Sequence, residues 1–541
     1  MPPINQPPPS RGAAPVPAGH GSGCDPTGNG FRSILFDSAE APADTVHEPE
    51  HFGDLNLGQM VAAITARTQP YRLAPFFYTA LDDLHLIAFR QEVFADLERP
   101  DVRATMAMFA RQELVARFAY QRRVMEKDDR GFGHYHLARG FLGAALVYCD
   151  TVERLAAGLH AADVKARGLR GLRGYLDRYL AGPDFRSLRD EARTLERELG
   201  EVRYSLLLSG SKVTVGPYDG QHPDYSAQVS ATFARFQQGA VTSDLPEFHD
   251  WDTYAGIGVL HLVAKLYPDL FARLDRFCAQ HASYLDATVA TFDREVEFYL
   301  GYIDYVQPLR DAGLTLSYPE MSATDKTEQA RGTFDLVLAS RLVAEGADVV
   351  CNDVSLDGSE RIIVVTGPNN GGKTTLARTI GQLHYIARLG CPVPGGDVRL
   401  FLCDAIFTRF ERREDSSTRD GKLQDELSRL CAALKAATPN SVFILNEMFN
   451  STTAEDALLL SRGILGQVSE LDALCVCVTF LDELARFNDA TVSMVAGVDP
   501  DDPAVRTFQV VRRAADGRAY ARALAQRYGL TYEQLVAPRV G

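Results

Sequence analysis

The sequence lacks the features that would place the chain in or across a membrane. None of its apolar runs reaches the roughly 18 residues that a helix needs to span a bilayer. The N-terminus also lacks the charged and then apolar segment of a secretory signal peptide. A hydrophobic fraction of 46% and a charged fraction of 23% are typical of a soluble globular protein. We therefore expect a cytoplasmic protein.

Cysteine patterns typical of metal sites or disulfide frameworks are absent as well. The nine cysteines are scattered along the chain. The closest pair, Cys475 and Cys477, lies in a predicted buried strand rather than in a C-x-x-C turn. This placement favours reduced thiols in the core over zinc ligands or disulfides.

Basic residues are in deficit, because 56 Lys and Arg face 71 Asp and Glu and leave a net charge of −15. Duplex DNA is bound largely by neutralising its phosphates, so this balance argues against a strong general affinity for DNA. One segment differs: Arg167, Arg170 and Arg173 are spaced by three and would share a helix face that could follow a phosphate backbone. Carboxylates between 190 and 198 begin to balance this charge. Two interpretations fit this segment, a contact with DNA and a solvated helix surface, and the second is favoured.

The chain divides into three parts by composition and periodicity. Residues 1–30 are a Pro- and Gly-rich tail that we expect to be disordered. Residues 31–330 read as a mostly α-helical domain, with a helix break at Gly182-Pro183. Residues 204–220 alternate and turn inside that domain, which predicts a β-hairpin. Residues 335–541 have the strand and helix pattern of an α/β domain.

A phosphate-binding loop lies near the start of the α/β part. The run IIVVTGPNNGGKTT at 362–375 is an apolar strand that breaks into a glycine-rich turn. Gly367, Gly372, Lys373 and Thr374 fit the pattern G-x-x-x-x-G-K-[ST]. In such a loop the backbone N–H groups cradle phosphate oxygens, the lysine reaches the β- and γ-phosphates, and the hydroxyl binds Mg²⁺. The sequence therefore predicts a nucleoside triphosphate site.

The residues around this loop resemble those of the MutS family. That family has TGPN-x-GGK-[ST]T, and this chain has TGPNNGGKTT at 366–375, AIFTRF at 405–410 and SVFILNEMFNSTTAEDA at 441–457. The similarity covers about residues 335–535. It implies that ATP is held by Gly367, Pro368, Asn369, Asn370, Gly371, Gly372, Lys373, Thr374 and Thr375.

The same resemblance assigns the hydrolytic roles. Glu447 follows a strand over 442–445 and would position the attacking water, while Lys373 would stabilise charge on the phosphates. Thr374 and Asn446 would hold the Mg²⁺ shell. Asn446 stands where the family has aspartate, and the loss of that charge should weaken metal binding. We therefore expect a slow, Mg²⁺-dependent ATPase.

Two further departures concern the segments that sense the nucleotide. Phe480 follows the predicted strand 474–478 where the family has a histidine, and it can neither donate nor accept a hydrogen bond. Gly421 and Lys422 occupy positions where the family has Ser and Thr, although Glu426 and Asp456 are retained. These changes imply an altered two-subunit nucleotide site.

The resemblance implies a fold with an α-helical core and lever region, followed by an ABC-type, MutS-like P-loop ATPase domain. It further implies a DNA-binding ATPase of DNA repair or mismatch-repair-related processing, a homodimer formed through C-terminal helices, and ATP-driven changes in the grip on DNA. We find no Phe-x-Glu segment of the kind that reads mismatches, so we expect the N-terminal mismatch-recognition domain to be absent, and likewise a C-terminal nuclease-like domain. The hairpin resembles a reduced DNA clamp, although a purely structural hairpin fits equally well.

Another class of function also fits the residues. Asn446, Phe480 and the acidic balance favour a nucleotide-gated dimer that has a protein partner and little ATP turnover. Glu447 and the intact P-loop favour an enzyme. An ABC-type ATPase of the chromosome-organising kind is less favoured, because no long heptad pattern flanks the P-loop.

Overall fold

The computed structural model describes most of the chain between Phe31 and Ala515. The described residues are 31–37, 46–66, 68, 71–111, 133–209, 212–218, 220, 254–410, 421–499, 501–502, 505–515 and 532. The predicted tail, residues 1–30, lies outside them, as does nearly all of the predicted C-terminal helical segment. No helix among the described residues combines the length and the apolar character needed to cross a membrane.

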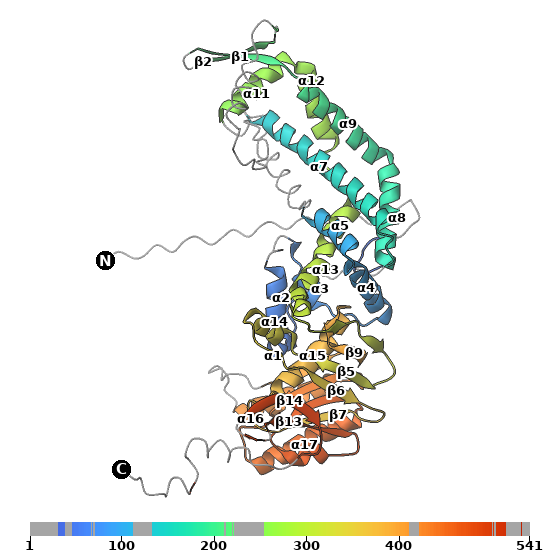
Figure 1. Cartoon of the computed structure of the whole chain (residues 1–541), viewed down its shortest axis with the longest axis vertical. Helices are drawn as coiled ribbons and strands as arrows, with labels where there is room; N and C mark the ends of the chain where they lie inside the picture. The colour runs from blue at the N-terminus through green and yellow to red at the C-terminus, as the bar shows by residue number, and fades with distance from the viewer. Residues whose placement is uncertain are drawn as a thin grey trace, which may run out of the picture.

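Helices form the first part of the described chain, and the longest of them build an arm that extends from the body of the molecule (Figure 1). α7 packs against α8, α9, α11 and α12 in this arm. α13 runs from the arm into the body, where it contacts α2, α5 and α14. The helices are α1 His51–Leu55, α2 Leu57–Thr65, α3 Ala74–Tyr78, α4 Leu84–Leu97, α5 Pro100–Ala110, α7 His134–Ala161, α8 Arg167–Ala181, α9 Pro183–Gly200, α11 Tyr254–Leu266, α12 Pro268–Gln280 and α13 Ala287–Asp311.

Local sequence signals account for several of these helices. In α2, Leu57, Met60, Val61 and Ile64 recur at helical spacing, and all four are buried. The predicted break at Gly182-Pro183 is confirmed, because α8 ends at Ala181 and the proline occupies the first turn of α9.

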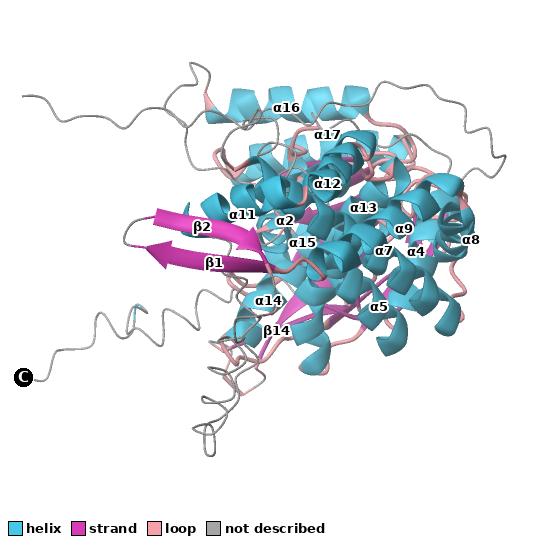
Figure 2. Cartoon of the chain, turned by 90° about the horizontal axis from the view of Figure 1, so that it is seen from above, coloured by secondary structure: helices cyan, strands magenta, loops and turns pink. Residues whose placement is uncertain are grey.

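The predicted hairpin is present at the far end of the arm, where it projects from the helices (Figure 2). Strands β1 (Tyr204–Ser209) and β2 (Lys212–Pro217) pair antiparallel, with Ser209 opposite Lys212. The base of the hairpin packs on the core through Tyr204 and Val215, and β2 contacts α11. Further out, Leu206, Leu207 and Val213 are exposed.

The second part is an α/β unit with two main sheets. The larger sheet has the order β10-β11-β12-β7-β13-β14, in which only β14 is antiparallel to its neighbour. The smaller sheet has the order β4-β9-β5-β6. The strands are β3 Leu316–Ser317, β4 Glu320–Ser322, β5 Glu328–Thr333, β6 Asn352–Leu356, β7 Ile362–Thr366, β8 Val393–Pro394, β9 Gly396–Phe401, β10 Ile406–Arg409, β11 Val442–Asn446, β12 Leu474–Val478, β13 Thr491–Val498 and β14 Arg506–Arg512. The helices are α14 Leu336–Ala344, α15 Lys373–Arg388, α16 Lys422–Ala436, α17 Ala454–Glu470 and the 3₁₀ helix η3 Asp482–Arg486.

The six-stranded sheet has a different hydrophobic core on each face. Ile362 and Val364 of β7 face a core that includes α17 residues such as Leu465. Ile363 and Val365 face the larger core, which contains α15 and continues through the helices of the body and arm. Because side chains alternate along a strand, β7 contributes to both cores and reads as a continuous apolar run. The loop that leads into α15 thus begins at the end of a strand that is buried on both faces.

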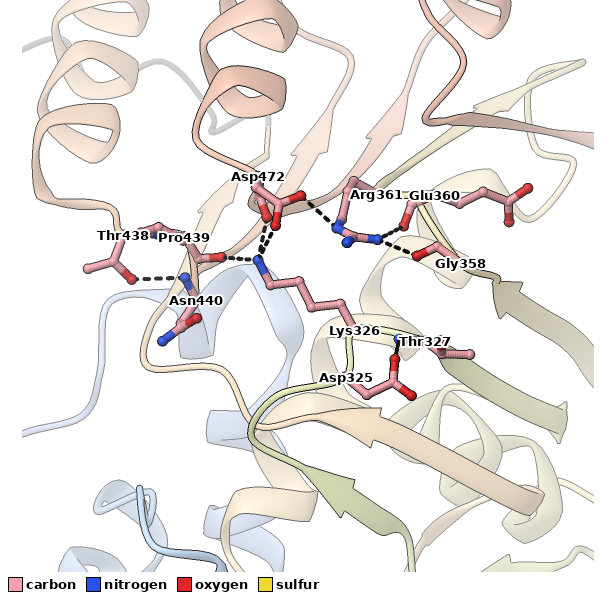
Figure 3. A network of polar contacts seen from close by, with 10 residues as sticks. All are labelled: Asp325, Lys326, Thr327, Gly358, Glu360, Arg361, Thr438, Pro439, Asn440 and Asp472. Carbon is pink, nitrogen blue, oxygen red and sulfur yellow. Dashed lines mark hydrogen bonds and ion pairs between the residues drawn. The ribbon is translucent and has the colours of Figure 1, made fainter.

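A polar network joins the two sheets at the amino ends of the parallel strands (Figure 3). Lys326, in the β4–β5 connection, donates to the Pro439 carbonyl at 2.9 Å and to the Asp472 carboxylate at 2.9 Å. Arg361, just before β7, donates to the other carboxylate oxygen of Asp472 at 2.8 Å. These charge-assisted bonds hold the small sheet against the connections that lead into β7, β11 and β12.

The structure places the change from the helical part to the α/β part earlier than the sequence-based description does. The expected domain boundary at 330–335 falls at the end of β5, whereas the change from helices to strands lies between Asp311 and Leu316. The strands before residue 335 have two to six residues, which is too short for periodicity to separate them from loops. Asp54 of α1 accepts a hydrogen bond from the Thr408 hydroxyl of β10 at 2.7 Å, which joins the helical part to the larger sheet.

A buried ion pair between α15 and the small sheet should make stability depend on pH. His384 Nε2 lies 3.1 Å from Glu328 Oε1, and both side chains are buried. Burial alone would lower the pKa of His384, but the Glu328 carboxylate, together with a smaller contribution from Cys403, outweighs burial and raises that pKa to about 10. Since the unfolded value is about 6.5, the pair contributes fully below that pH and its contribution is lost as the pH rises through the folded value.

We expect the free energy of unfolding of the wild type to fall by about 3 kcal/mol between pH 7 and 10 relative to Glu328→Gln, which has no charged partner for His384. Urea unfolding at pH 7, 8.5 and 10 would measure this difference. Glu320→Gln, at an exposed position on β4, is the matched control and should follow the wild type. Parallel pH curves for wild type and Glu328→Gln would contradict the assignment.

Candidate functional site

The predicted phosphate-binding loop connects β7 to α15 and has a backbone that only glycine adopts easily at two positions. Gly367 has φ of 120°, and a Cβ there would lie 2.9 Å from the Ala496 carbonyl oxygen of β13. Gly372 has φ of 91° and is the N-cap residue of α15. The loop therefore turns tightly against β13, and its N–H groups lie at the N-terminus of a 16-residue helix. This is an anion-binding arrangement.

Lys373 is the first residue of α15, and its side chain folds back onto the loop. Its Nζ donates to the Gly367 carbonyl at 3.0 Å and to the Pro368 carbonyl at 2.9 Å. The side chain is buried, with the residue 4% exposed. Burial lowers the pKa of Lys373, and the carboxylate of Glu447 opposes that shift. The ammonium group is thus held at the loop rather than in solvent.

The two predicted metal ligands lie together. Thr374 Oγ1 donates to Asn446 Oδ1 at 2.9 Å, which joins the first turn of α15 to the carboxyl end of β11. β11 is buried along its whole length, so its last residue is delivered to the phosphate end of the sheet. A hydroxyl and an amide oxygen are oxygen ligands that suit Mg²⁺. Because Asn446 is neutral, the pair supplies no negative charge of its own.

Glu447, the predicted water-positioning residue, follows β11 in a strained conformation. Its φ is 53°, in a region that non-glycine residues seldom adopt. Its backbone N–H donates to the Val478 carbonyl at the end of β12, at 2.8 Å, which holds it in place. Its carboxylate partly offsets the lowering of the Lys373 pKa by burial, as a negative charge near an ammonium group does. Strained non-glycine residues concentrate at functional sites.

The retained acids of the neighbouring segments have structural partners. Glu426 of α16 is buried, lies 3.4 Å from Arg409 of β10, and accepts from the Phe449 backbone N–H at 3.2 Å. Thr453 is the N-cap of α17 and exchanges hydrogen bonds with Asp456, at 3.2 Å from the Asp456 N–H and 2.8 Å to its carboxylate. Both acids therefore shape the loops around the β11 end.

Sequence reasoning missed the contribution of β14 to the site. Arg506 Nε donates to the Asn369 carbonyl of the loop at 3.0 Å, and its charge helps to lower the pKa of Lys373. The backbone of Phe508 lies against Gly372, 3.4 Å from where a Cβ would stand. Arg506 adds a second positive charge beside the loop, which suits a phosphate ligand. No motif marks Arg506, because it is 133 residues beyond Lys373 in sequence and reaches the loop only through sheet topology.

The structure brings together most of the predicted site. The loop, Lys373, Thr374, Asn446 and Glu447 converge at the carboxyl ends of β7 and β11, and Phe480 joins them from the end of β12. Gly421 caps the N-terminus of α16 and Ser428 is exposed on that helix. Residues 411–420, which precede these positions, lie outside the described residues.

Comparison with known proteins identifies the relatives of this site. The MutS domain V family model matches residues 363–531. The chain is 31% identical over 193 residues to DNA mismatch repair protein MutS of Shouchella clausii (strain KSM-K16), covering 35% of this chain and 22% of that protein. It is 26% identical over 259 residues to DNA mismatch repair protein MutS of Chloroflexus aurantiacus (strain ATCC 29366 / DSM 635 / J-10-fl), covering 47% and 25%.

The chain is also 33% identical over 157 residues to DNA mismatch repair protein MSH3 of Kluyveromyces lactis, which covers 28% of this chain and 15% of that protein. The chain thus spans a quarter or less of the length of these relatives. The matched region contains the loop, α15, β11, Glu447 and Phe480. Residues 363–531 thus match the MutS domain V family model, and the chain is similar over part of its length to MutS and MSH3 proteins.

Proposed function

We propose that this protein is a DNA-binding ATPase of the DNA repair type, which binds ATP at the 367–375 loop and changes its grip on DNA with the state of the nucleotide. Hydrolysis would be slow and Mg²⁺-dependent. The observation that carries the proposal is the position of α15, which begins at the phosphate loop and is bonded along its length to the helical body.

The bonds between α15 and the helical body follow one another along the helix. Gln382 Nε2 donates to the Leu55 carbonyl at 2.9 Å, and the Tyr385 hydroxyl donates to the Phe77 carbonyl at 2.9 Å. At its end, Arg388 Nε donates to the Leu81 carbonyl at 3.0 Å. A movement of α15 that accompanies phosphate binding would therefore move α1, α3 and the residues that lead into α4, which is a route from the nucleotide to the arm.

The chemistry of the site fits phosphate transfer to water. Loop N–H groups, Lys373 and Arg506 would bind the phosphates, and Glu447 would orient the attacking water and accept its proton. Mg²⁺, when bound by Thr374 and Asn446, would neutralise phosphate charge. The neutral amide at 446 gives a weaker metal site than a carboxylate would, which supports slow turnover.

The proposed DNA binding is supported by the relatives, which are DNA mismatch repair proteins, and by the shape of the arm, which ends in a hairpin far from the nucleotide site (Figure 1). The described arginines of the arm give it limited support. Arg167 pairs with Glu92 at 2.9 Å, and Arg193 with Glu153 at 2.7 Å. Arg170 and Arg178, in contrast, are exposed on α8.

The proposal predicts nucleotide-dependent DNA binding. Fluorescence anisotropy with labelled homoduplex, single-mismatch duplex and four-way junction at near-physiological salt should show binding to at least one of them. ATP with Mg²⁺ should change that affinity about fivefold or more. Lys373→Ala should bind the same DNA without responding to nucleotide. Absence of binding to all three DNAs would refute the proposed DNA binding and favour a protein partner instead.

The second candidate is a nucleotide-gated dimer with a protein partner and little ATP turnover. It is favoured by the hairpin, whose exposed residues are mostly apolar: Leu206, Leu207, Val213 and Tyr218 are 38–67% exposed. Such a surface suits a protein better than a phosphate backbone. ATP would then set the geometry between two copies of the chain.

A further inference from the structure

Phe480 covers the ammonium group of the phosphate-binding lysine. Lys373 Nζ lies 4.2 Å from the centroid of the Phe480 ring, a distance at which a cation and an aromatic face attract each other. An ammonium group has three N–H donors, and two of them are used by the carbonyls of Gly367 and Pro368. The ring lies close enough to engage the third. Two carbonyls and the ring thus share the ammonium group.

The ring lies on the side of the site where the last phosphate must fit. A phosphate loop holds the inner phosphates with its backbone N–H groups, so a third phosphate extends toward the carboxyl ends of the neighbouring strands. Phe480 follows β12, which lies between β7 and β11 in the sheet, and Glu447 is bonded to the last residue of β12. Phe480 therefore stands between the loop and the residue proposed to position water.

The ring has room to move, unlike the lysine that it covers. Phe480 is 50% exposed, whereas Lys373 is 4% exposed. Exposed side chains change rotamer on the picosecond to nanosecond scale, so the ring can leave without unfolding its surroundings. Moving the ring away would nevertheless cost the attraction between the ring and the ammonium group. This attraction is larger when the cation is desolvated, as the buried Lys373 is.

We propose that Phe480 is a specificity-determining residue that makes this site prefer a nucleoside diphosphate over a triphosphate. The third phosphate must displace the ring to reach Lys373, whereas the inner phosphates are held mainly by the loop backbone. This inference rests on the proposed nucleotide site and deepens it, because it names the state in which the site is most stable. The protein would wait in a diphosphate-bound or empty state and respond only to high triphosphate concentrations.

The test compares affinities for ADP and for a non-hydrolysable ATP analogue, both with Mg²⁺, by isothermal titration calorimetry. Phe480→Leu keeps an apolar side chain but has no aromatic face. It should bind the ATP analogue about tenfold more tightly than the wild type, and ADP within about twofold. Phe480→Tyr keeps the ring and should keep the wild-type ratio of the two affinities. Tyr218→Leu removes a similarly exposed ring on the hairpin and serves as the control.

Each outcome decides the proposal. An unchanged ratio in Phe480→Leu, with both nucleotides still bound, would overturn the role of Phe480 and leave the nucleotide site intact. Equal tightening of both nucleotides would also overturn it, because the ring would then act on the whole site. Wild-type protein that binds neither nucleotide would refute the proposed function and this inference together.

Discussion

Replacing Glu447 with glutamine is expected to lower ATP turnover at least about a hundredfold while leaving ATP affinity within about twofold of the wild type. Glutamine preserves the shape of the side chain but cannot accept a proton from the attacking water. The positive φ of Glu447 and its bond to the Val478 carbonyl depend on the backbone, so the substitution should leave the site folded. Phosphate release in the steady state and equilibrium ATP binding would separate the two effects.

Lys373→Ala should lose both properties, because it removes the charge that holds the phosphates. We expect ATP affinity to fall by at least about tenfold and turnover to reach the background. Glu470→Gln, an exposed position at the far end of α17, is the matched control for Glu447→Gln and should behave as wild type. Wild-type turnover no higher than that of Lys373→Ala would contradict the enzyme and favour the nucleotide-gated interaction protein.

Replacing Arg90 with methionine is expected to lower the free energy of unfolding by about 4 kcal/mol. Arg90 of α4 is fully buried, and its guanidinium donates to the Leu35 carbonyl at 3.0 Å and to the Leu389 carbonyl at 3.1 Å. Its charge also lies near Glu295 of α13, which accepts from the Ile34 N–H at 2.8 Å. Methionine would fill much of the space but leave the two carbonyls without their donor and remove the positive charge that lies near the buried Glu295.

Arg90 is also informative because of what it connects. The N-terminal strap at 31–37, α4, α13 and the turn that ends α15 all meet at its side chain. Arg90→Lys should not restore stability, since a single ammonium group cannot reproduce the planar fork that reaches both carbonyls. Urea unfolding would measure the loss, and Arg186→Met, at an exposed position on α9, is the control. A loss under about 1 kcal/mol would contradict this role.

Local sequence determined the features whose physical cause is local. The apolar β-branched run before Gly367 predicts β7, and the structure has the strand at Ile362–Thr366. The strand before Glu447 and the strand over 474–478 are confirmed in the same way, because short buried strands read as continuous apolar runs. The alternation at 204–220 predicts a hairpin, and the antiparallel pairing of β1 and β2 confirms it. Signals that end a helix, such as Gly182-Pro183, act within a few residues and can be recognised in the sequence in the same way.

The tertiary structure alone decided which distant residues share the nucleotide site and which hold the domains together. Arg506 reaches the loop because β14 folds back beside β13, and Phe480 reaches Lys373 because β12 neighbours β7 in the sheet. Arg90 looks like any helical arginine in sequence, yet the meeting of α4, α13 and the end of α15 buries it completely. Periodicity and motifs report the preferences of neighbouring residues, whereas these contacts join residues 55 to 299 positions apart. Strand order and helix packing create them, and no short stretch of sequence contains that information.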